Sequence, residues 1–171
     1  MRGINVGGNG IIKMADLKTA VEKAGFTGVK TYIQSGNIIF SSAETDTARV
    51  EVKLEKTVLS TFKLESPVVA VNRTHLAEIL AQAPPEWEKD DLRRYIAFIK
   101  APVTAADIIG DFEVKEGVDS VQAGNGVIYM TTTMEGLTKS KLSKVMGKPS
   151  YKLVTMRNYT TAKKMLELMD K

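Results

Sequence analysis

The sequence predicts an α+β protein built from two ferredoxin-like subdomains, each with an antiparallel sheet. The first observation is the order of helix-type and strand-type segments, which follows β-α-β-β-α-β in the first half and again in the second. The second is a glycine- and asparagine-containing turn between paired strand segments in each half. We therefore expect one subdomain over residues 1–72. Residues 73–171 should hold a connecting helix, a second subdomain and a C-terminal helix.

The first half alternates helical and strand periodicity. Val50, Leu54, Val58 and Phe62 recur at the spacing of one helix face. β-branched and aromatic residues before Ser35 predict a strand that turns back at Gly36. The expected elements, in order, are a strand tail over 4–6, a helix over 14–24, hairpin strands over 29–34 and 37–42, a helix over 47–62 and a strand over 67–71.

The second half has its own helix and turn signals. Thr104 is a suitable N-cap for a short helix. The run Gly124, Asn125, Gly126 predicts a hairpin, and Gly147 with Pro149 predicts a helix end. The expected elements, in order, are a helix over 74–82, a strand over 94–99, a helix over 104–109, hairpin strands over 118–123 and 127–132, a helix over 140–146, a strand over 151–155 and a helix over 160–169.

The composition excludes several classes of protein. Hydrophobic residues make up 43% and charged residues 26% of 171 residues, which is typical of a soluble globular chain. There is no cysteine, so disulfides, zinc-thiolate sites and thiol catalysis are excluded. No apolar run is long enough to span a membrane, and no signal peptide opens the chain. We expect a cytoplasmic protein without a membrane, metal or cofactor requirement.

The net charge of +4 is unevenly distributed. Residues 136–171 hold nine cations against two carboxylates, which leaves +7 there and −3 over the remainder. Such an asymmetry can mark a surface for phosphate or nucleic acid, but cation counts alone discriminate weakly. A solvated face explains it equally simply.

The most unusual segment is a glycine loop, which we define as residues 3–12, between Arg2 and Lys13. It contains Gly3, Gly7, Gly8 and Gly10 together with Asn5 and Asn9. Glycines between a strand and a helix let the backbone approach a ligand, and amide groups there can cradle an anion. The loop is neither a P-loop, which needs Gly-Lys-Ser/Thr, nor a dinucleotide fingerprint, which needs an acidic residue where Gln34 stands. The alternative is a tight connection whose asparagines bond their own backbone.

Two further clusters accompany the glycine loop. Ser35, Gly36 and Asn37 form the first hairpin turn, and positive φ angles alone would explain the last two. Arg157 and Asn158 precede the last helix, where Asn is a favoured N-cap. Arg157 has no such simple explanation.

Taken together, these clusters resemble domain-of-unknown-function family 1697, a bacterial family of small proteins. The resemblance rests on residues 2–8, Lys13-Met14, residues 31–37 and Arg157-Asn158, and it covers essentially the whole chain. It implies two ferredoxin-like subdomains, and it implies no established substrate, cofactor or catalytic residue. Members usually have a hydrophobic strand before this run, whereas here Met1 alone precedes Arg2, so we expect a truncated or misassigned start. Tyr159 stands where the family often has Trp.

Few residues offer catalytic chemistry. Ser35 is the best-placed nucleophile, but only Lys13 or Lys141 is available as its base. His75, the only histidine, fits a surface or capping role, and no metal-ligand spacing is visible. Tyr95 and Phe98 are an odd number of residues apart, so in a strand they face opposite sides and form no paired platform for stacking RNA bases.

The sequence therefore favours a protein that binds a phosphorylated small molecule or another anion, and assigns no oligomeric state and no catalytic residue. A metal-independent enzyme with a site around Arg2, Lys13, Ser35, Asn37 and Arg157 is the alternative, as is a nucleic-acid-binding plait or a pure interaction module. The candidate ligand-binding residues are Arg2, Asn5, Gly7, Gly8, Lys13, Ser35, Gly36, Asn37, Arg157 and Asn158.

Overall fold

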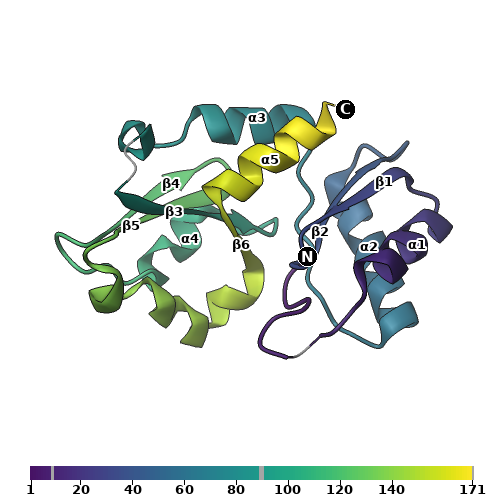
Figure 1. The fold of residues 1–171 in the computed structure, drawn as a ribbon, viewed down its shortest axis with the longest axis horizontal. Coiled ribbons are helices and arrows are strands. Elements are labelled where there is room, and N and C mark those ends of the chain that lie inside the picture. Colours follow the sequence, from purple (N-terminus) through teal and green to yellow (C-terminus); the bar gives the residue numbers. More distant parts are fainter. Residues whose placement is uncertain (9, 89–90, 171) are drawn as a thin grey trace. The chain divides into compact units, whose positions relative to one another are not determined.

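A computed structural model describes residues 1–8, 10–88 and 91–170 (Figure 1). The α+β class with antiparallel sheets is confirmed, because the described strands form one sheet of two strands and one of four. The chain divides into two compact units: Met1–Arg73 together with Lys164–Lys171, and Thr74–Lys163. Asn9 of the glycine loop lies outside the described residues.

The first unit contains two complete helices and a hairpin, together with the last turns of the C-terminal helix. Helix α1 (Met14–Lys23) and helix α2 (Thr47–Phe62) accompany strands β1 (Thr27–Tyr32) and β2 (Asn37–Ser41). The two strands pair antiparallel, with Tyr32 opposite Asn37. Asp46 begins α2 as its N-cap, accepting hydrogen bonds from the amides of residues 48 and 49, and Lys63 ends it at a φ of 56°.

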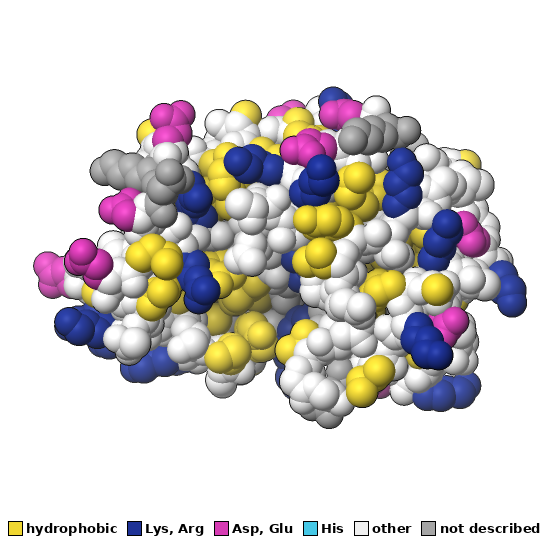
Figure 2. Space-filling model, in the orientation of Figure 1, with side chains coloured by type: hydrophobic (Ala, Val, Ile, Leu, Met, Phe, Trp, Pro, Cys, Tyr) yellow, Lys and Arg dark blue, Asp and Glu magenta, His cyan; other side chains and the backbone are white. Residues whose placement is uncertain are grey.

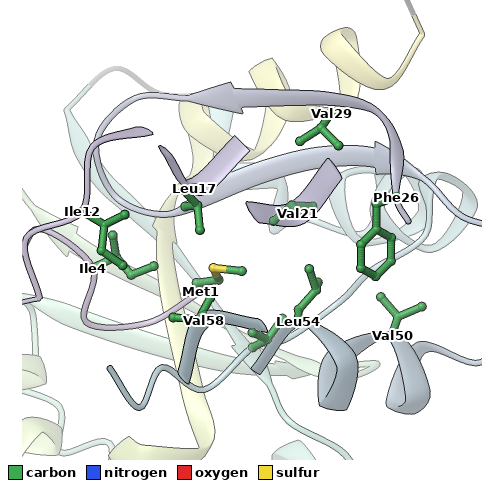
Figure 3. Packing of buried hydrophobic residues seen from close by; sticks show 11 residues of the cluster. Met1, Ile4, Ile12, Leu17, Val21, Phe26, Val29, Val50, Leu54 and Val58 are labelled. Carbon is green, nitrogen blue, oxygen red and sulfur yellow. The ribbon is translucent and has the colours of Figure 1, made fainter. Parts of the chain in front are cut away.

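Apolar side chains from α1, α2, β1 and β2 meet in one core (Figure 3). Leu17 and Val21 of α1 face Leu54 and Val58 of α2, and all four are almost fully buried. Each such side chain contributes roughly 1.5–3 kcal/mol when it leaves water. Ile4 is fully buried and Ile12 nearly so, which fastens both arms of the glycine loop to the same core.

Two strands that the sequence predicts for this unit do not form. Residues 4–6 are not extended, because Asn5 has a φ of 54°, a left-handed conformation that no strand contains. Residues 67–71 form no ladder either. The backbone amides of Val68 and Ala70 donate instead to the carboxylates of Glu55 and Glu51 on α2, both at 2.8 Å.

The second unit holds the four-stranded sheet. Its strands are β3 (Leu92–Ile99), β4 (Asp119–Gly124), β5 (Val127–Thr133) and β6 (Val154–Asn158), and they lie in the order β4-β5-β3-β6 with every neighbour antiparallel. This is the strand order of the split βαβ plait that the sequence predicts. Helix α4 (Ala105–Ile108) begins at Thr104, whose predicted capping role is confirmed by reciprocal hydrogen bonds with Asp107.

Both faces of this sheet are covered (Figure 1). On one face, Ala97, Ile99, Ile128 and Met130 pack with α4 and with the 3-10 turn Leu142–Gly147. On the other, Tyr129 donates its hydroxyl to the carbonyl of Ile79 in helix α3 (Arg73–Ala81) at 2.7 Å. The final helix, α5 (Tyr159–Met169), brings Tyr159 edge-on to Trp87 with ring centroids 5.0 Å apart.

The structure corrects the end of the second unit. The predicted helix over 140–146 is a series of short 3-10 turns at Leu137–Lys139, Leu142–Gly147 and Pro149–Leu153. The closing strand begins at Val154 rather than residue 151, because Pro149 starts the last of these turns. Arg157 and Asn158 consequently lie in β6, where they pair with Ile96 and Tyr95 of β3, rather than in a loop.

Candidate functional site

The glycine loop is closed at its base by Asn5. The backbone amide of Asn5 donates to the carbonyl of Gly10 at 3.0 Å. Its side chain brackets Ile12, accepting from the amide at 2.8 Å and donating to the carbonyl at 2.9 Å. The same Nδ2 donates to the carbonyl of Gln34 at 2.9 Å, which joins the loop to the hairpin turn. Asn5 thus acts as a structural clamp, the role that the alternative interpretation gave to the asparagines.

Two glycines are required where the loop and the hairpin turn come close to other parts of the chain. A Cβ at Gly10, whose φ is 60°, would lie 2.3 Å from the carbonyl oxygen of Gly3. A Cβ at Gly36, whose φ is 73°, would lie 3.2–3.3 Å from Met1 and Ile4 in the core. The carbonyl of Gly36 also accepts a hydrogen bond from the nitrogen of Met1 at 3.0 Å. Gly36 is therefore explained by packing and conformation, without a ligand.

The tip of the glycine loop is different. Gly7 and Gly8 are consecutive, exposed, and left-handed, with φ angles of 59° and 78°. A Cβ at either position would meet nothing within 4 Å. Within the described residues, the amides of Gly7 and Gly8 have no hydrogen-bond partner. No described residue occupies these two donors. The left-handed φ angles favour glycine at both positions, whereas packing does not require it.

Charged groups flank the loop on either side. Lys13 is exposed and directly precedes α1, and its side chain does not cap the helix. The helix dipole adds positive potential at this end, while Asp16 in the first turn opposes it. Arg2 is half-buried, and its backbone is fixed by hydrogen bonds with Pro67 and Ser66 at 2.9 and 2.7 Å.

The hairpin turn brings Ser35 and Asn37 together. Asn37 is buried, and its Nδ2 donates to Ser35 Oγ at 3.0 Å and to the carbonyl of Tyr32 at 3.2 Å. An amide N–H removes no proton, so this contact does not activate the hydroxyl as a nucleophile. Asn37 holds the turn in shape.

The remaining two candidates belong to the second unit. Arg157 donates from Nη1 to Thr155 Oγ1 at 3.0 Å and to the carbonyl of Met156 at 2.7 Å. Burial lowers the pKa of Arg157 to about 10, so the protein bears a cost for keeping this charge. Asn158 is exposed and directly precedes α5. The eight candidate residues from Arg2 to Asn37 therefore lie in the first unit, and Arg157 and Asn158 lie in the second.

The aromatic residues considered for RNA stacking are not presented on an open sheet. Tyr95 packs with Ala97 and Ile99 on one face, so Phe98 faces the other side, as the spacing predicts. Phe98 and Tyr129 are 7% and 2% exposed, and burial raises the pKa of Tyr129. Helix α3 covers Tyr129 through Ile79, so its ring does not offer a stacking surface.

Sequence reasoning missed a polar network around Asp119 in the second unit. One carboxylate oxygen of Asp119 accepts from the hydroxyls of Ser140 and Thr132, at 2.7 and 2.9 Å. The other accepts from the amides of Lys141 and Lys115, at 2.9 and 3.0 Å. Partial burial opposes the charge, but these four hydrogen bonds outweigh it and hold the pKa of Asp119 below its usual range. No local pattern reveals this network, because its members come from four separate segments.

Among residues 1–8, 10–88 and 91–170, no group of three or more His, Cys, Asp or Glu side chains is placed to hold a metal ion. Among the helices of the described chain, none combines the length and the apolar composition needed to cross a bilayer.

Comparison with known proteins decides the family. The family model described as "Protein of unknown function (DUF1697)" matches residues 1–129, about three quarters of the chain. The chain belongs to the DUF1697 family. The resemblance inferred from the glycine loop, the hairpin turn and the Arg157-Asn158 pair is thus confirmed at the level of the family. No curated protein matches this DUF1697 chain significantly.

A solved structure supports the fold. The conserved bacterial protein SP0830 from Streptococcus pneumoniae is similar with a TM-score of 0.84 and 26% sequence identity. The alignment covers 99% of this chain and 95% of that protein. Neither this description nor the DUF1697 description states an activity, so the function has to be argued from the residues themselves.

Proposed function

We propose that this DUF1697 protein binds a phosphate-bearing small molecule, or another anion, at the tip of its glycine loop. The observation that carries the proposal is the pair of exposed, left-handed glycines, Gly7 and Gly8, whose amides have no partner within the described residues. Successive amides in turn conformations form anion-binding concavities in proteins, and residues 7 and 8 lie in a turn.

The surroundings of the loop support the same ligand. Asn5 fixes the base of the loop, so the tip is held ready without the ligand having to order it. Lys13 and the uncapped start of α1 supply positive potential. Two charge-assisted hydrogen bonds at about 1.5–3 kcal/mol each correspond to an affinity on the order of 1 mM for inorganic phosphate.

The first test of the proposal uses a matched set of glycine variants. Gly7→Ala and Gly8→Ala should each weaken phosphate binding severalfold in isothermal titration calorimetry at low salt. Gly117→Ala is the control, because Gly117 is also exposed, has a φ of 72°, and is surrounded by open space. All three variants carry the same left-handed strain of about 1–2 kcal/mol, so only binding distinguishes them. Equal phosphate affinity in the three variants would overturn the proposal.

A second test uses charge. Lys13→Gln should weaken phosphate binding and Asp16→Asn should strengthen it, each by about 2–5-fold at low salt, because the two side chains contribute opposite charges near the loop. Lys30→Gln, on β1, serves as the control for the loss of one cation. If both Lys13→Gln and Asp16→Asn leave the affinity unchanged, the anion does not bind at this end of α1.

Binding is preferred to catalysis because the contact of Ser35 with Asn37 supplies no general base. It is preferred to nucleic-acid stacking because Tyr129 is covered by α3. The absence of cysteine fits the reducing cytoplasm, where we place this function.

A further inference from the structure

We propose that the ligand of the glycine loop is a phosphate ester whose other end is an apolar ring, and that Val6, Ile11 and Ile33 hold that ring. This inference rests on the proposed function, because the phosphate is taken to occupy the loop tip. It adds the class of molecule that carries the phosphate.

The first observation is a concentration of exposed aliphatic side chains. The described residues expose eight large hydrophobic side chains, and three of them are Val6, Ile11 and Ile33, at 59%, 78% and 50% exposure. On the face drawn in Figure 2, exposed hydrophobic side chains lie next to Lys and Arg side chains in several places. What distinguishes these three is that each is next in the sequence to Asn5 or to a residue hydrogen-bonded to it.

The hydrogen bonds of Asn5 bring the three residues together. Val6 follows Asn5, Ile11 lies between the bonded residues Gly10 and Ile12, and Ile33 precedes Gln34, whose carbonyl accepts from Asn5 at 2.9 Å. The Cα atoms of Val6, Ile11 and Ile33 are therefore each about 3.8 Å from the Cα atom of a residue in the Asn5 hydrogen-bond network. Three separate positions in the sequence thus flank one hydrogen-bond network, and Gly7 follows Val6 directly.

The second observation concerns the backbone of Ile33. Its φ is 50°, a left-handed conformation that a β-branched residue adopts only at a cost. Glycine would remove that cost, and Ile33 is not among the residues packed in the core of the first unit. A strained, exposed aliphatic residue next to a member of the Asn5 network fits a role in ligand binding, where the contact of its side chain with the ligand would offset the backbone strain.

The two kinds of contact select the ligand. The amides of Gly7 and Gly8 with Lys13 complement a negative group, and the aliphatic side chains complement an apolar body attached to it. Branched aliphatic side chains pack against the flat face of a ring. If the ring and the aliphatic side chains together bury about 60–80 Å² of apolar surface, at about 25 cal/mol per Å², the ligand should bind roughly 10–30-fold more tightly than one without the ring.

The experiment compares three probes by calorimetry on the full chain: inorganic phosphate, ribose 5-phosphate and adenosine 5′-monophosphate. The last two share a phosphate ester and differ in the ring. We expect adenosine 5′-monophosphate to bind about 10-fold more tightly than ribose 5-phosphate. Ile33→Gly should reduce that ratio to about 3-fold or less without lowering the urea midpoint, since it also relieves the left-handed strain. Val52→Ser, at a similarly exposed position on α2, should leave the ratio unchanged.

The outcomes separate this inference from the proposed function. If all three probes bind with equal affinity, or if Ile33→Gly leaves the ratio unchanged, the ring contact is refuted while anion binding stands. If none of the probes binds, the anion site itself is refuted, and this inference falls with it.

Discussion

The clamp formed by Asn5 makes the strongest prediction about the architecture of the site. Its side chain makes three hydrogen bonds to the backbone, two with Ile12 and one with Gln34, at 2.8–2.9 Å. At about 1 kcal/mol each, their loss should cost about 3 kcal/mol of unfolding free energy in Asn5→Ala. Asn5→Gly loses the same bonds but no longer strains a side chain at a φ of 54°, so it should be about 1 kcal/mol less damaging than Asn5→Ala.

Urea unfolding followed by circular dichroism measures both values. Gln34→Ala is the control, because Asn5 bonds the backbone carbonyl of Gln34, which this substitution keeps, and the side chain that it removes is exposed. The clamp would be refuted if Asn5→Ala unfolded at the same urea concentration as Gln34→Ala. It would be equally refuted if Asn5→Gly were the more damaging of the two Asn5 variants.

Three further expectations follow from the structure. Gly36→Ala should lose about 2 kcal/mol, because its φ is 73° and its Cβ would press on Ile4, whereas Gly147→Ala, in open space without a positive φ, should lose less than about 0.5 kcal/mol in the same unfolding assay. Asp119→Asn should lower the unfolding free energy by about 1–2 kcal/mol at pH 7. Folding lowers the pKa of Asp119, so the stabilisation by its carboxylate is complete above the unfolded pKa of about 3.9 and is lost as the pH falls through the folded pKa. The unfolding free energies of the variant and the parent protein should therefore converge in acid. Replacing Lys139, Lys141, Lys144 and Lys148 together by Ala should leave the affinity for adenosine 5′-monophosphate within about 2-fold; submicromolar binding of single-stranded RNA at about physiological salt, abolished by these changes, would instead support a nucleic-acid function.

Local patterns in the sequence were sufficient for most of the helices and for the second sheet. The stripe of Val50, Leu54, Val58 and Phe62 predicts the bounds of α2, because one buried face and an Asp46 N-cap define that helix without distant contacts. The hairpin of β4 and β5 follows from the turn at Gly124–Gly126 in the same way.

Predictions that depend on tertiary partners were wrong. Residues 67–71 have strand composition, but Glu51 and Glu55 take the amides of Ala70 and Val68 that a neighbouring strand would have bonded. The segment after Ser140 has helical periodicity, yet Asp119 binds both the Ser140 hydroxyl and the Lys141 amide, and only 3-10 turns follow. Neither carboxylate partnership is visible in the spacing of residues.

The ligand-binding role of the candidate residues stays a prediction, and the structural role that several of them have was not foreseen from the sequence. The sequence singled out the glycine loop and the hairpin turn, and in the structure Asn5 joins them through its hydrogen bond to Gln34. It did not distinguish the structural members, Asn5, Gly36 and Asn37, from the exposed tip at Gly7 and Gly8. Ile33 gave no signal at all, because its significance lies in a φ of 50° that only the structure shows.

The most direct test of anion binding is a nuclear magnetic resonance titration of the backbone amides with inorganic phosphate at low salt. The amide signals of Gly7 and Gly8 should shift progressively and saturate, while that of Gly117, equally exposed and left-handed, stays in place. If saturating phosphate moves neither Gly7 nor Gly8, or moves Gly117 as much, the glycine loop is not an anion site and the proposed function is contradicted.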